Sequence, residues 1–224
     1  SSDTNSITII NNNFTDCGNK GISISGSNLY GLISGNTMIG GVDKGIYVYN
    51  LDYGQIVNNH IQGFEDNALY VYSSENLLID SNTVFNNNGG FYIDRYNYSI
   101  IISNNSIYDN NIFNSSGEAF SGIYIFSNND GQILNNTIYN NNSYGIKVNY
   151  YSTYQKIDCS GNLIYGHSQA GIYFESYQNG DVVDNLIYDN GSDGVYFVDA
   201  EANVEVKNNT IDNHSGYGLY ARDF

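Results

Sequence analysis

The sequence predicts a parallel β-solenoid of about nine turns, on the basis of three observations. A short motif built around asparagine recurs along the whole chain, strand-like alternation accompanies each copy, and no helical 3.6-residue periodicity occurs. Three short strands in about 23 residues can bury their apolar sides only if successive repeats coil and stack. At a strand spacing of ~4.8 Å, nine such turns form a stack ~40 Å long.

The asparagine motif reads aliphatic, two variable residues, Asn, one variable residue, apolar, as in IVNNHI at 56–61. Successive copies lie 24, 23, 23, 23, 31, 26, 23 and 24 residues apart, so the fifth turn carries an insertion. Asparagine tolerates the left-handed conformation of a sharp turn, and its amide can hydrogen-bond between turns. We therefore expect an asparagine ladder at Asn12, Asn36, Asn59, Asn82, Asn105, Asn136, Asn162, Asn185 and Asn209.

Each repeat then passes through a polar stretch to a strand of the form Gly-aliphatic-x-aliphatic, such as GIYVYN at 45–50. Its aliphatic residues are expected to face the core and its intervening residues to face outward. The glycine column has one exception, an alanine, and reads Gly21, Gly45, Ala68, Gly90, Gly122, Gly145, Gly171, Gly194 and Gly218.

Composition limits the classes of partner. Seven basic residues against 23 acidic ones give a formal net charge of −16, which argues against nucleic acid and anionic membranes because both are bound through Lys and Arg. No apolar run approaches the ~18 residues of a membrane span, so we expect no membrane insertion. We expect an extracellular or cell-surface protein.

The repeat, seen as NNTIYNNNSYGIKV at 135–148, resembles that of right-handed parallel β-helix proteins over essentially all of residues 7–224. That family includes polysaccharide lyases, epimerases, hydrolases, phage spikes and surface proteins. A leucine-rich repeat has a similar period but needs a Leu-rich strand, whereas this core is Ile and Val. The resemblance implies that the outer face of the Gly-aliphatic strand, with the loop before it, carries any substrate cleft.

Outward positions of that strand form two rows that are aromatic in the middle of the chain. A tyrosine offers a flat apolar face and a hydroxyl, which suits a sugar ring. The alternative is structural, because stacked aromatic residues also stabilise neighbouring strands. The predicted carbohydrate-binding residues are Tyr47, Tyr49, Tyr70, Tyr72, Tyr92, Tyr124, Phe126, Tyr173 and Tyr196.

Candidate catalytic groups interrupt these rows or lie in the loops beside them. Asp66 and Asp94 could serve as general acid and base on a glycosidic bond. Alternatively, Tyr72 could abstract a proton next to a uronate carboxylate that Arg95 binds. Glu118 lies in the insertion of the fifth turn. No complete lyase, polygalacturonase or epimerase motif occurs, so the reaction class stays open between lyase, hydrolase, epimerase and no enzyme.

Other chemistry-bearing residues give weaker signals. Cys159 occupies a core column, and Cys17 is expected in the loop of the first turn, too far away for a disulfide. The three histidines are expected to be solvated surface residues. No cofactor or metal motif is evident; a Ca²⁺ site stays open, although the GGxGxD repeat is missing. Asn-x-Ser/Thr triplets, candidate N-glycosylation sites, begin at Asn13, Asn97, Asn104, Asn114, Asn135, Asn141, Asn190, Asn208 and Asn213.

We expect residues 1–224 to form one β-helix domain, as a segment of a longer protein or a unit that assembles end to end. No capping helix precedes Ile7, and open solenoid ends favour self-association. The sequence therefore predicts a polysaccharide-engaging face with glycan-cleaving or epimerising activity left open. The alternative is a non-enzymatic surface layer, filament or adhesin.

Overall fold

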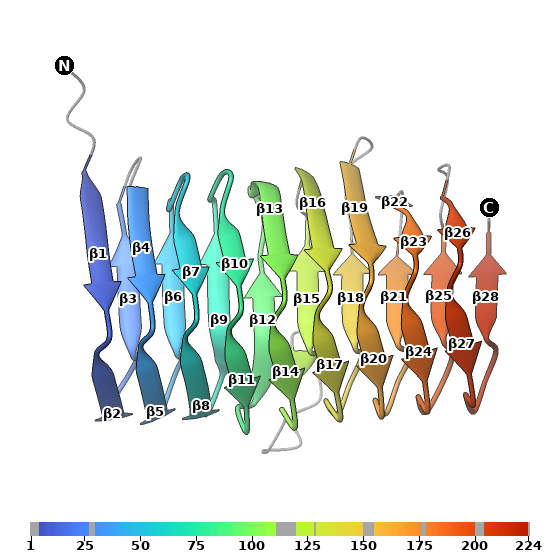
Figure 1. Ribbon diagram of the computed structural model, residues 1–224, viewed down its shortest axis with the longest axis horizontal. Helices are drawn as coiled ribbons and strands as arrows, with labels where there is room; N and C mark the ends of the chain where they lie inside the picture. Colours follow the sequence, from blue (N-terminus) through green and yellow to red (C-terminus); the bar gives the residue numbers. More distant parts are fainter. Residues whose placement is uncertain are drawn as a thin grey trace.

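The computed structural model describes residues 5–26, 30–110, 120–127, 129–149, 155–175, 178–199 and 204–223. Within these ranges the chain forms strands and no α-helix, so none of the described segments is a helix that could cross a membrane. Each turn of the chain contributes one strand to each of three parallel sheets, here called A, B and C (Figure 1). The fold is a right-handed parallel β-solenoid, as the sequence predicts.

Each sheet stacks nine successive strands, one for each turn, and sheet A has one further short strand, β22, beside β19. Sheet A contains β1 (Ser6–Ile10), β4 (Tyr30–Ser34), β7 (Gln55–Val57), β10 (Leu78–Asp80), β13 (Tyr98–Ser103), β16 (Asn129–Leu134), β19 (Gln155–Ser160), β22 (Gln178–Asn179), β23 (Val182–Val183) and β26 (Val206–Lys207). Sheet B contains β2 (Asn13–Cys17), β5 (Thr37–Gly41), β8 (His60–Phe64), β11 (Thr83–Phe85), β14 (Ser106–Tyr108), β17 (Thr137–Tyr139), β20 (Leu163–Tyr165), β24 (Leu186–Tyr188) and β27 (Thr210–Asp212).

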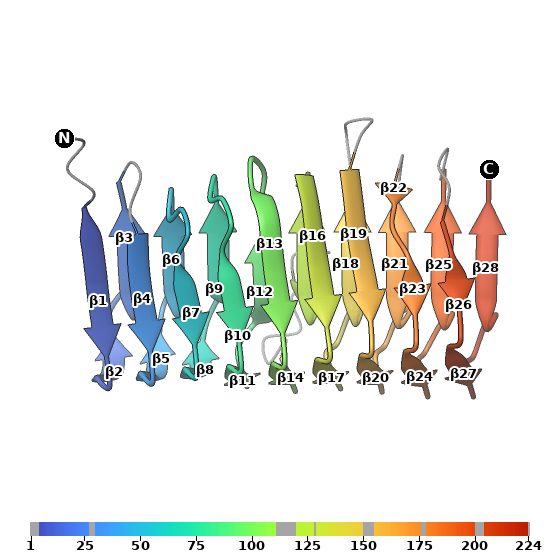
Figure 2. The same cartoon turned by 45° about the horizontal axis from the view of Figure 1, so that its top comes forward.

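Sheet C contains β3 (Ile22–Ser25), β6 (Ile46–Tyr49), β9 (Asn67–Tyr72), β12 (Gly89–Ile93), β15 (Ile123–Phe126), β18 (Ile146–Asn149), β21 (Ile172–Glu175), β25 (Val195–Val198) and β28 (Leu219–Arg222). Figure 2 shows that turn 1 and turn 9 lie at opposite ends of the long axis. A methyl group on Gly90, just inside β12, would lie 2.0 Å from the carbonyl oxygen of Gly122 in the next turn. This close approach of successive turns explains the glycine column.

The bend between sheets A and B holds the predicted asparagine ladder. Asn59 is buried, and its backbone N–H and side-chain Nδ2 donate to Oδ1 of Asn82 at 2.9 and 3.0 Å. The same Nδ2 donates to the Ile33 carbonyl of the preceding turn at 2.9 Å. The left-handed conformation falls on the residue just before each ladder asparagine, as at Asn58 (φ 55°), rather than on the ladder residue itself. In each bend, the residue before the ladder adopts the left-handed conformation and the ladder asparagine makes the hydrogen bonds between turns.

A second ladder, at the bend between sheets B and C, escaped the sequence analysis. Each of its members lies five residues after the first ladder: Asn87, Asn110, Asn141, His167, Asn190 and His214, from turn 4 onward. Asn87 Nδ2, for example, donates to Oδ1 of Asn110 at 3.1 Å. His167 takes an asparagine position and is 2% exposed, so the expectation of a solvated histidine is wrong there.

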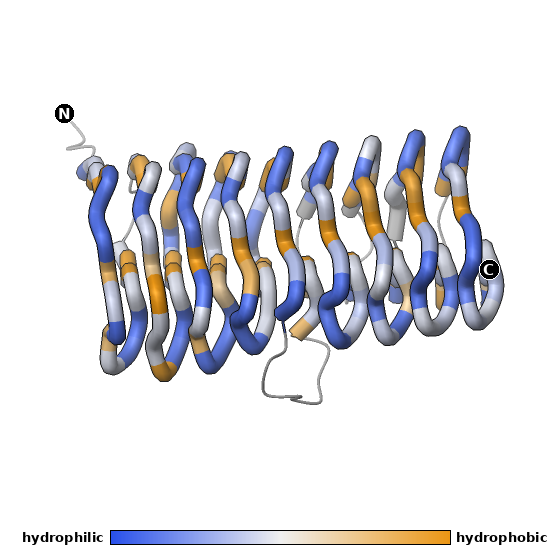
Figure 3. Tube along the Cα trace, turned by 60° about the horizontal axis from the view of Figure 1, so that its bottom comes forward, coloured by the Kyte–Doolittle hydropathy of each residue, from blue (hydrophilic) through white to orange (hydrophobic). Residues whose placement is uncertain are grey.

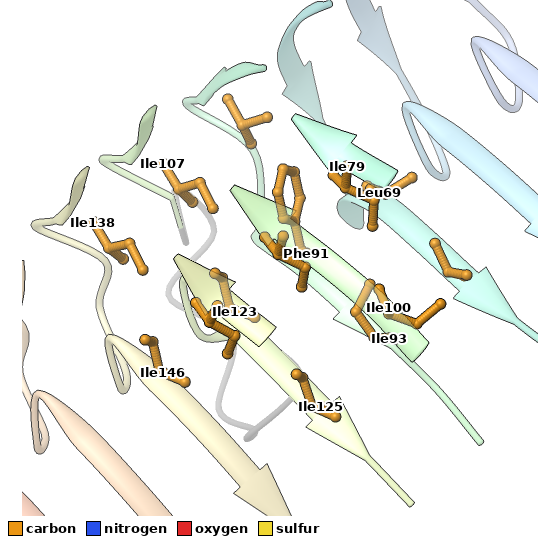
Figure 4. Close-up of a cluster of buried hydrophobic side chains, with 14 of the residues drawn as sticks. Leu69, Ile79, Phe91, Ile93, Ile100, Ile107, Ile123, Ile125, Ile138 and Ile146 are labelled. Atoms are coloured by element: carbon orange, nitrogen blue, oxygen red, sulfur yellow. The ribbon is translucent and has the colours of Figure 1, made fainter. Parts of the chain in front are cut away.

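The core is a stack of aliphatic side chains from all three sheets. Apolar segments recur at the same place on successive turns (Figure 3). Figure 4 shows Ile107 and Ile138 of sheet B and Ile123 and Ile146 of sheet C stacking in columns. All four side chains are fully buried. Cys159 is also fully buried in this core, as expected, whereas Cys17 ends β2 rather than lying in a loop, and both thiols are free.

Candidate functional site

The outer face of sheet C carries the two predicted rows, and strand register fixes their members. β6 pairs with β9 so that Tyr47 faces Tyr70 and Tyr49 faces Tyr72. The inner row follows the first outward position of each strand: Ser23, Tyr47, Tyr70, Tyr92, Tyr124, Lys147, Tyr173, Tyr196 and Tyr220. The outer row follows the second: Ser25, Tyr49, Tyr72, Asp94, Phe126, Asn149, Glu175, Val198 and Arg222.

The rings of the inner row do not form one continuous stack. Tyr47 and Tyr70 are parallel within 7°, with ring centroids 5.4 Å apart. The next pair, Tyr70 and Tyr92, meets edge to face at 86°, and Tyr92 then stacks on Tyr124 at 22°. The ring planes therefore turn by about a right angle between turns 3 and 4. Tyr124 is only 6% exposed, so it offers almost no surface to a ligand, in contrast to the sequence expectation.

The outer row is more accessible over turns 2 to 4. Tyr49 is 37% exposed and stacks on Tyr72 with centroids 5.4 Å apart. Tyr96, in the bend after β12, meets Tyr72 edge to face at 80° and is itself exposed. Together these three rings form an accessible aromatic surface. A sugar ring packs on surfaces of this kind through its C–H groups.

A buried carboxylate lies beside this aromatic surface. Asp94 is 7% exposed, and its Oδ2 accepts a hydrogen bond from the Tyr70 hydroxyl. Its Oδ1 accepts from the Arg95 backbone N–H at 2.8 Å and lies 3.3 Å from Arg95 Nε. The Arg95 guanidinium is half exposed and lies 5.0 Å from the Phe126 ring centroid. We call Tyr70, Tyr92, Asp94, Arg95 and Phe126 the turn-4 junction.

Burial and the Asp94 carboxylate keep the junction tyrosines protonated. Burial first, and then the Asp94 hydrogen bond, raise the pKa of Tyr70 well above its ordinary value. Burial and the charge of Asp94 raise the pKa of Tyr92 to about 12. Desolvation, Tyr96 and Asp94 also raise the pKa of Tyr72, with Arg95 opposing. A tyrosine that acts as a general base needs a lowered pKa, so this arrangement favours hydroxyls that donate hydrogen bonds.

The two candidate acids Asp66 and Asp94 lie at opposite ends of sheet C. Asp66 directly precedes β9, whereas Asp94 follows β12 at the level of Tyr72. Six residues of strand separate the two levels, or roughly 20 Å at ~3.3 Å each. Carboxylates that share a glycosidic bond are ~5 to 9.5 Å apart. The structure does not bring this pair together, and Glu118 lies outside the described residues.

A lysine-carboxylate cluster occupies the edge where the strands of sheet C begin. Lys44 Nζ lies 2.8 Å from Asp43 Oδ1 and 2.5 Å from Asp66 Oδ2, and 5.3 Å from the Tyr70 ring centroid. Lys20 pairs with Asp43 and lies 5.4 Å from the Tyr47 ring centroid. Burial opposes ionisation of Asp43, but the two lysines hold the pKa of that carboxyl below its ordinary value.

Lys147, in the inner row, is buried rather than presented to solvent. It is 1% exposed, and its Nζ lies 2.9 Å from Glu175 Oε2 and 4.5 Å from the Tyr173 ring centroid. Asn149 Nδ2 also donates to Glu175 at 3.0 Å. The alternation in GIKV at 145–148 indicates an outward position for Lys147, but it does not show that Tyr144 and Tyr173 flank the side chain.

Five of the seven basic residues belong to sheet C or the residues beside it, namely Lys20, Lys44, Arg95, Lys147 and Arg222. Each lies within ion-pair distance of a carboxylate. The basic residues of this face are therefore paired, and its accessible residues over turns 2 to 4 include Tyr49 and Tyr96. No group of three or more His, Cys, Asp or Glu able to hold a metal occurs in the described part of the chain.

Three hollows of the described surface lie outside the strands of sheet C. A polar groove of about 750 Å³ follows the bend between sheets B and C, lined by Asp109, Asn140, His167, Asp189 and other bend residues. Two smaller hollows, of about 340 and 260 Å³, lie on sheet A. The described strands of sheet C line none of these three hollows.

The structure divides the candidate glycosylation triplets into two groups. Asn97, Asn141 and Asn190 are at most 2% exposed. Their side chains accept hydrogen bonds from the backbone of the preceding turn. A glycan cannot be attached to them in the folded chain, so these three expectations are wrong. The exposed triplets begin at Asn13, Asn104, Asn135, Asn208 and Asn213, and Asn114 lies outside the described residues.

Sequence comparison identifies the family. The chain matches the family described as "Right handed beta helix region" over residues 1–160 and again over 109–223, and it belongs to that family. No curated protein sequence matches it.

Solved structures share the fold at low sequence identity. A double mutant of the periplasmic alginate epimerase AlgG superposes with a TM-score of 0.64 at 15% identity, over 94% of this chain and 51% of that one. The A-module of the Azotobacter vinelandii mannuronan C-5 epimerase AlgE4 gives 0.64 at 13% identity, over 95% of this chain and 70% of the module. This chain thus spans about half the length of the AlgG structure. The surface protein and adhesin PfbA of Streptococcus pneumoniae gives 0.44 at 14% identity, over 96% and 84%.

Proposed function

We propose that this protein binds an extended polysaccharide along the outer face of sheet C, outside the cytoplasm. One observation carries the proposal. Regular aromatic stacking breaks at the turn-4 junction, where ring planes turn by about a right angle and a carboxylate meets an arginine. Rings that leave a stack can present their faces to a ligand, while Asp94 and Arg95 supply hydrogen-bonding groups beside them.

The ion pairs of the basic residues on sheet C determine how we expect the polysaccharide to bind. Because each cation of this face already has a carboxylate partner, we expect aromatic contact and hydrogen bonds to dominate over charge attraction. Affinity for a neutral polysaccharide should then depend only weakly on salt. The likeness in fold to two alginate epimerases makes alginate a reasonable first ligand to test, beside neutral polysaccharides.

Binding is proposed in preference to catalysis for a physical reason. The raised pKa values of Tyr72 and Tyr92 oppose proton abstraction, and Asp66 and Asp94 are too far apart to share one bond. Arg95 and Asp94 therefore serve to hold and orient the ligand. Turnover of any polysaccharide would replace this proposal with an enzymatic one.

A direct test combines binding with a depolymerisation and epimerisation assay. The probes are alginate, polymannuronate, pectin, xylan and a mixed-linkage glucan, offered to the wild type and to an Asp94→Asn, Arg95→Ala variant. Lys207→Ala, an exposed residue of sheet A, is the matched control. Binding without turnover that the double variant loses and the control keeps supports the proposal. Absence of binding to every probe contradicts it and favours a purely structural surface module.

A further inference from the structure

Sheet B presents an outer face that differs in charge from the rest of the molecule. The first and third residues of its strands point outward and form two columns, all within the described residues. In turn 1 the exposed Asp16 of β2 lies next to these columns. The small column is Asn13, Thr37, His60, Thr83, Ser106, Thr137, Leu163, Leu186 and Thr210. The ring column is Thr15, Ile39, Gln62, Phe85, Tyr108, Tyr139, Tyr165, Tyr188 and Asp212.

Neither column holds an Asp, Glu, Lys or Arg before Asp212 in turn 9. The chain as a whole has 30 such residues, 23 acidic and 7 basic, and a formal net charge of −16. Sheet A, by contrast, carries Lys156, Asp158 and Asp181 on its outer side, joined by ion pairs. Depletion of charge with enrichment of tyrosine is the composition of the buried centre of a protein interface.

The ring column is regular enough to present one flat surface. Five rings from Phe85 to Tyr188 stack with centroids 5.0, 4.8, 5.0 and 4.8 Å apart and planes within 4° of parallel. Because each ring face is covered by its neighbour, the column offers edges and hydroxyls rather than faces. A sugar ring needs a face to pack on, so this geometry does not suit carbohydrate.

We infer that two copies of this chain associate laterally through their sheet B faces. A flat face with the same ~4.8 Å repeat on both sides can stay in register at every turn. A two-fold axis parallel to the solenoid axis would place the ring column of one copy against the small column of the other. Rings would then face Thr or Ser side chains in turns 4 to 6 and leucine side chains in turns 7 and 8. Apolar side chains in both columns would be covered, including Ile39 (37% exposed) and Leu186 (42%).

Charge also selects this face for self-association. Two copies, each with a formal net charge of −16, repel one another, and a face whose two columns hold no carboxylate before Asp212 brings them together at a low electrostatic cost. Acidic residues remain at the rim, where Asp16, Asp109 and Asp189 follow the ring column. Added salt should therefore strengthen the dimer by screening this repulsion.

Size limits the strength of the association. Eight steps of ~4.8 Å and strands of about 10 Å give a contact of roughly 400 Å² of flat area, below that of standard interfaces. We therefore expect a reversible dimer that forms as the protein concentration rises to the range of about 10 to 500 µM.

Sedimentation velocity over that concentration range, at about 50 and about 500 mM salt, tests the inference. The wild-type mass should rise from the 24.9 kDa of one chain towards twice that value, further at high salt. Thr137→Glu places a charge at the centre of the face and should keep the chain monomeric. Gln132→Glu makes the same change on the exposed outer side of sheet A and should leave association intact.

Circular dichroism checks that each variant folds, and Leu186→Glu replaces Thr137→Glu if the latter does not. Three results would overturn the inference. The wild type could stay at 24.9 kDa throughout. Both charge variants could weaken association equally. Finally, the wild type could remain monomeric but co-sediment with an insoluble polysaccharide that Thr137→Glu no longer binds, which would assign the face to a glycan.

Discussion

Sheets B and C place tyrosines at equivalent outward positions of the same repeat, yet the rings pack differently. In sheet B, five consecutive rings are parallel within 4°. In sheet C, stacked pairs alternate with edge-to-face pairs, and Asp94, Lys147 and Glu175 interrupt the rows. The repeat by itself generates the regular stack. Sheet C departs from this regular stack at several positions, and we place the polysaccharide-binding surface at these positions.

His167, in the bend between sheets B and C, should have the largest expected effect, which is on the pH dependence of the free energy of unfolding. Burial lowers its pKa to about 4, although both ring nitrogens lie 3.2 Å from carbonyl oxygens. The unfolded chain binds a proton near pH 6.5 and the folded chain only near 4, so stability should fall as pH drops between these values. The loss amounts to about 3 kcal/mol.

Urea unfolding at pH 7 and at pH 4.5 measures this loss. His167→Asn, which restores the asparagine of the second ladder, should remove most of the pH dependence, since no imidazole then titrates at that position. An equal loss of stability in wild type and variant would place its origin elsewhere, for example at the partly buried His214, whose pKa is also lowered by burial.

Removal of a ring from the regular stack should destabilise the protein without affecting a ligand. Tyr139→Ala deletes the middle of the sheet B column and two stacked contacts at 4.8 and 5.0 Å. We expect a loss of about 2 kcal/mol in the free energy of unfolding, measured by denaturant titration. Tyr139→Phe keeps the ring and should be near neutral. Polysaccharide affinity should be unchanged in both variants, and a loss of affinity would mean that sheet B also binds the glycan.

The opposite result is expected for the accessible surface of sheet C. Tyr72→Ala removes the ring between Tyr49 and Tyr96 and should weaken polysaccharide binding by about tenfold, while lowering the denaturation midpoint less than Tyr139→Ala does. Tyr53→Ala, at an exposed tyrosine beside sheet A, is the control for affinity. If Tyr72→Ala lowered the midpoint and spared affinity, the distinction between the two sheets would fail.

The smallest expected effect concerns proton binding at the turn-4 junction. Asp94→Asn removes the negative charge that, after burial, raises the pKa of Tyr92 to about 12. The pKa should move back towards the ordinary value of ~10, which absorbance of the phenolate reports. In the wild type, the contribution of Tyr92 to stability is complete below pH ~10 and is lost as pH rises through about 12. An unchanged titration would show that burial alone sets the pKa.

Strand order, turn number and core columns were predictable because each depends on a residue pattern that repeats every turn. The stacked Ile and Val columns and the first asparagine ladder follow from such a pattern. The sheet B rings left a signal too, in the repeated Ile-Tyr pairs of β14, β17, β20 and β24. The second ladder left one in the Asn or His five residues after the first ladder from turn 4 onward. Both signals were overlooked because the sheet C tyrosines resembled a binding surface.

The burial and contacts of a residue that differs in type from the rest of its column did not follow from the sequence and required the structure. Burial of Lys147 depends on which rings flank it, and burial of His167 depends on its taking an asparagine position in the ladder. The distance between Asp66 and Asp94 depends on their levels along the strands, which a count of turns does not give. Repeats thus predict the scaffold, whereas exceptions to the repeat determine the chemistry of its surface.

Ion pairing of the basic residues has a consequence for the survival of the chain in surroundings rich in proteases. Trypsin-like enzymes cut after Lys or Arg, and only seven such positions exist in 224 residues. Each of the seven side chains lies within ion-pair distance of a carboxylate, and Lys147 is buried. The segments outside the described ranges contain neither Lys nor Arg. The folded chain should therefore remain intact during digestion that would cut an ordinary loop.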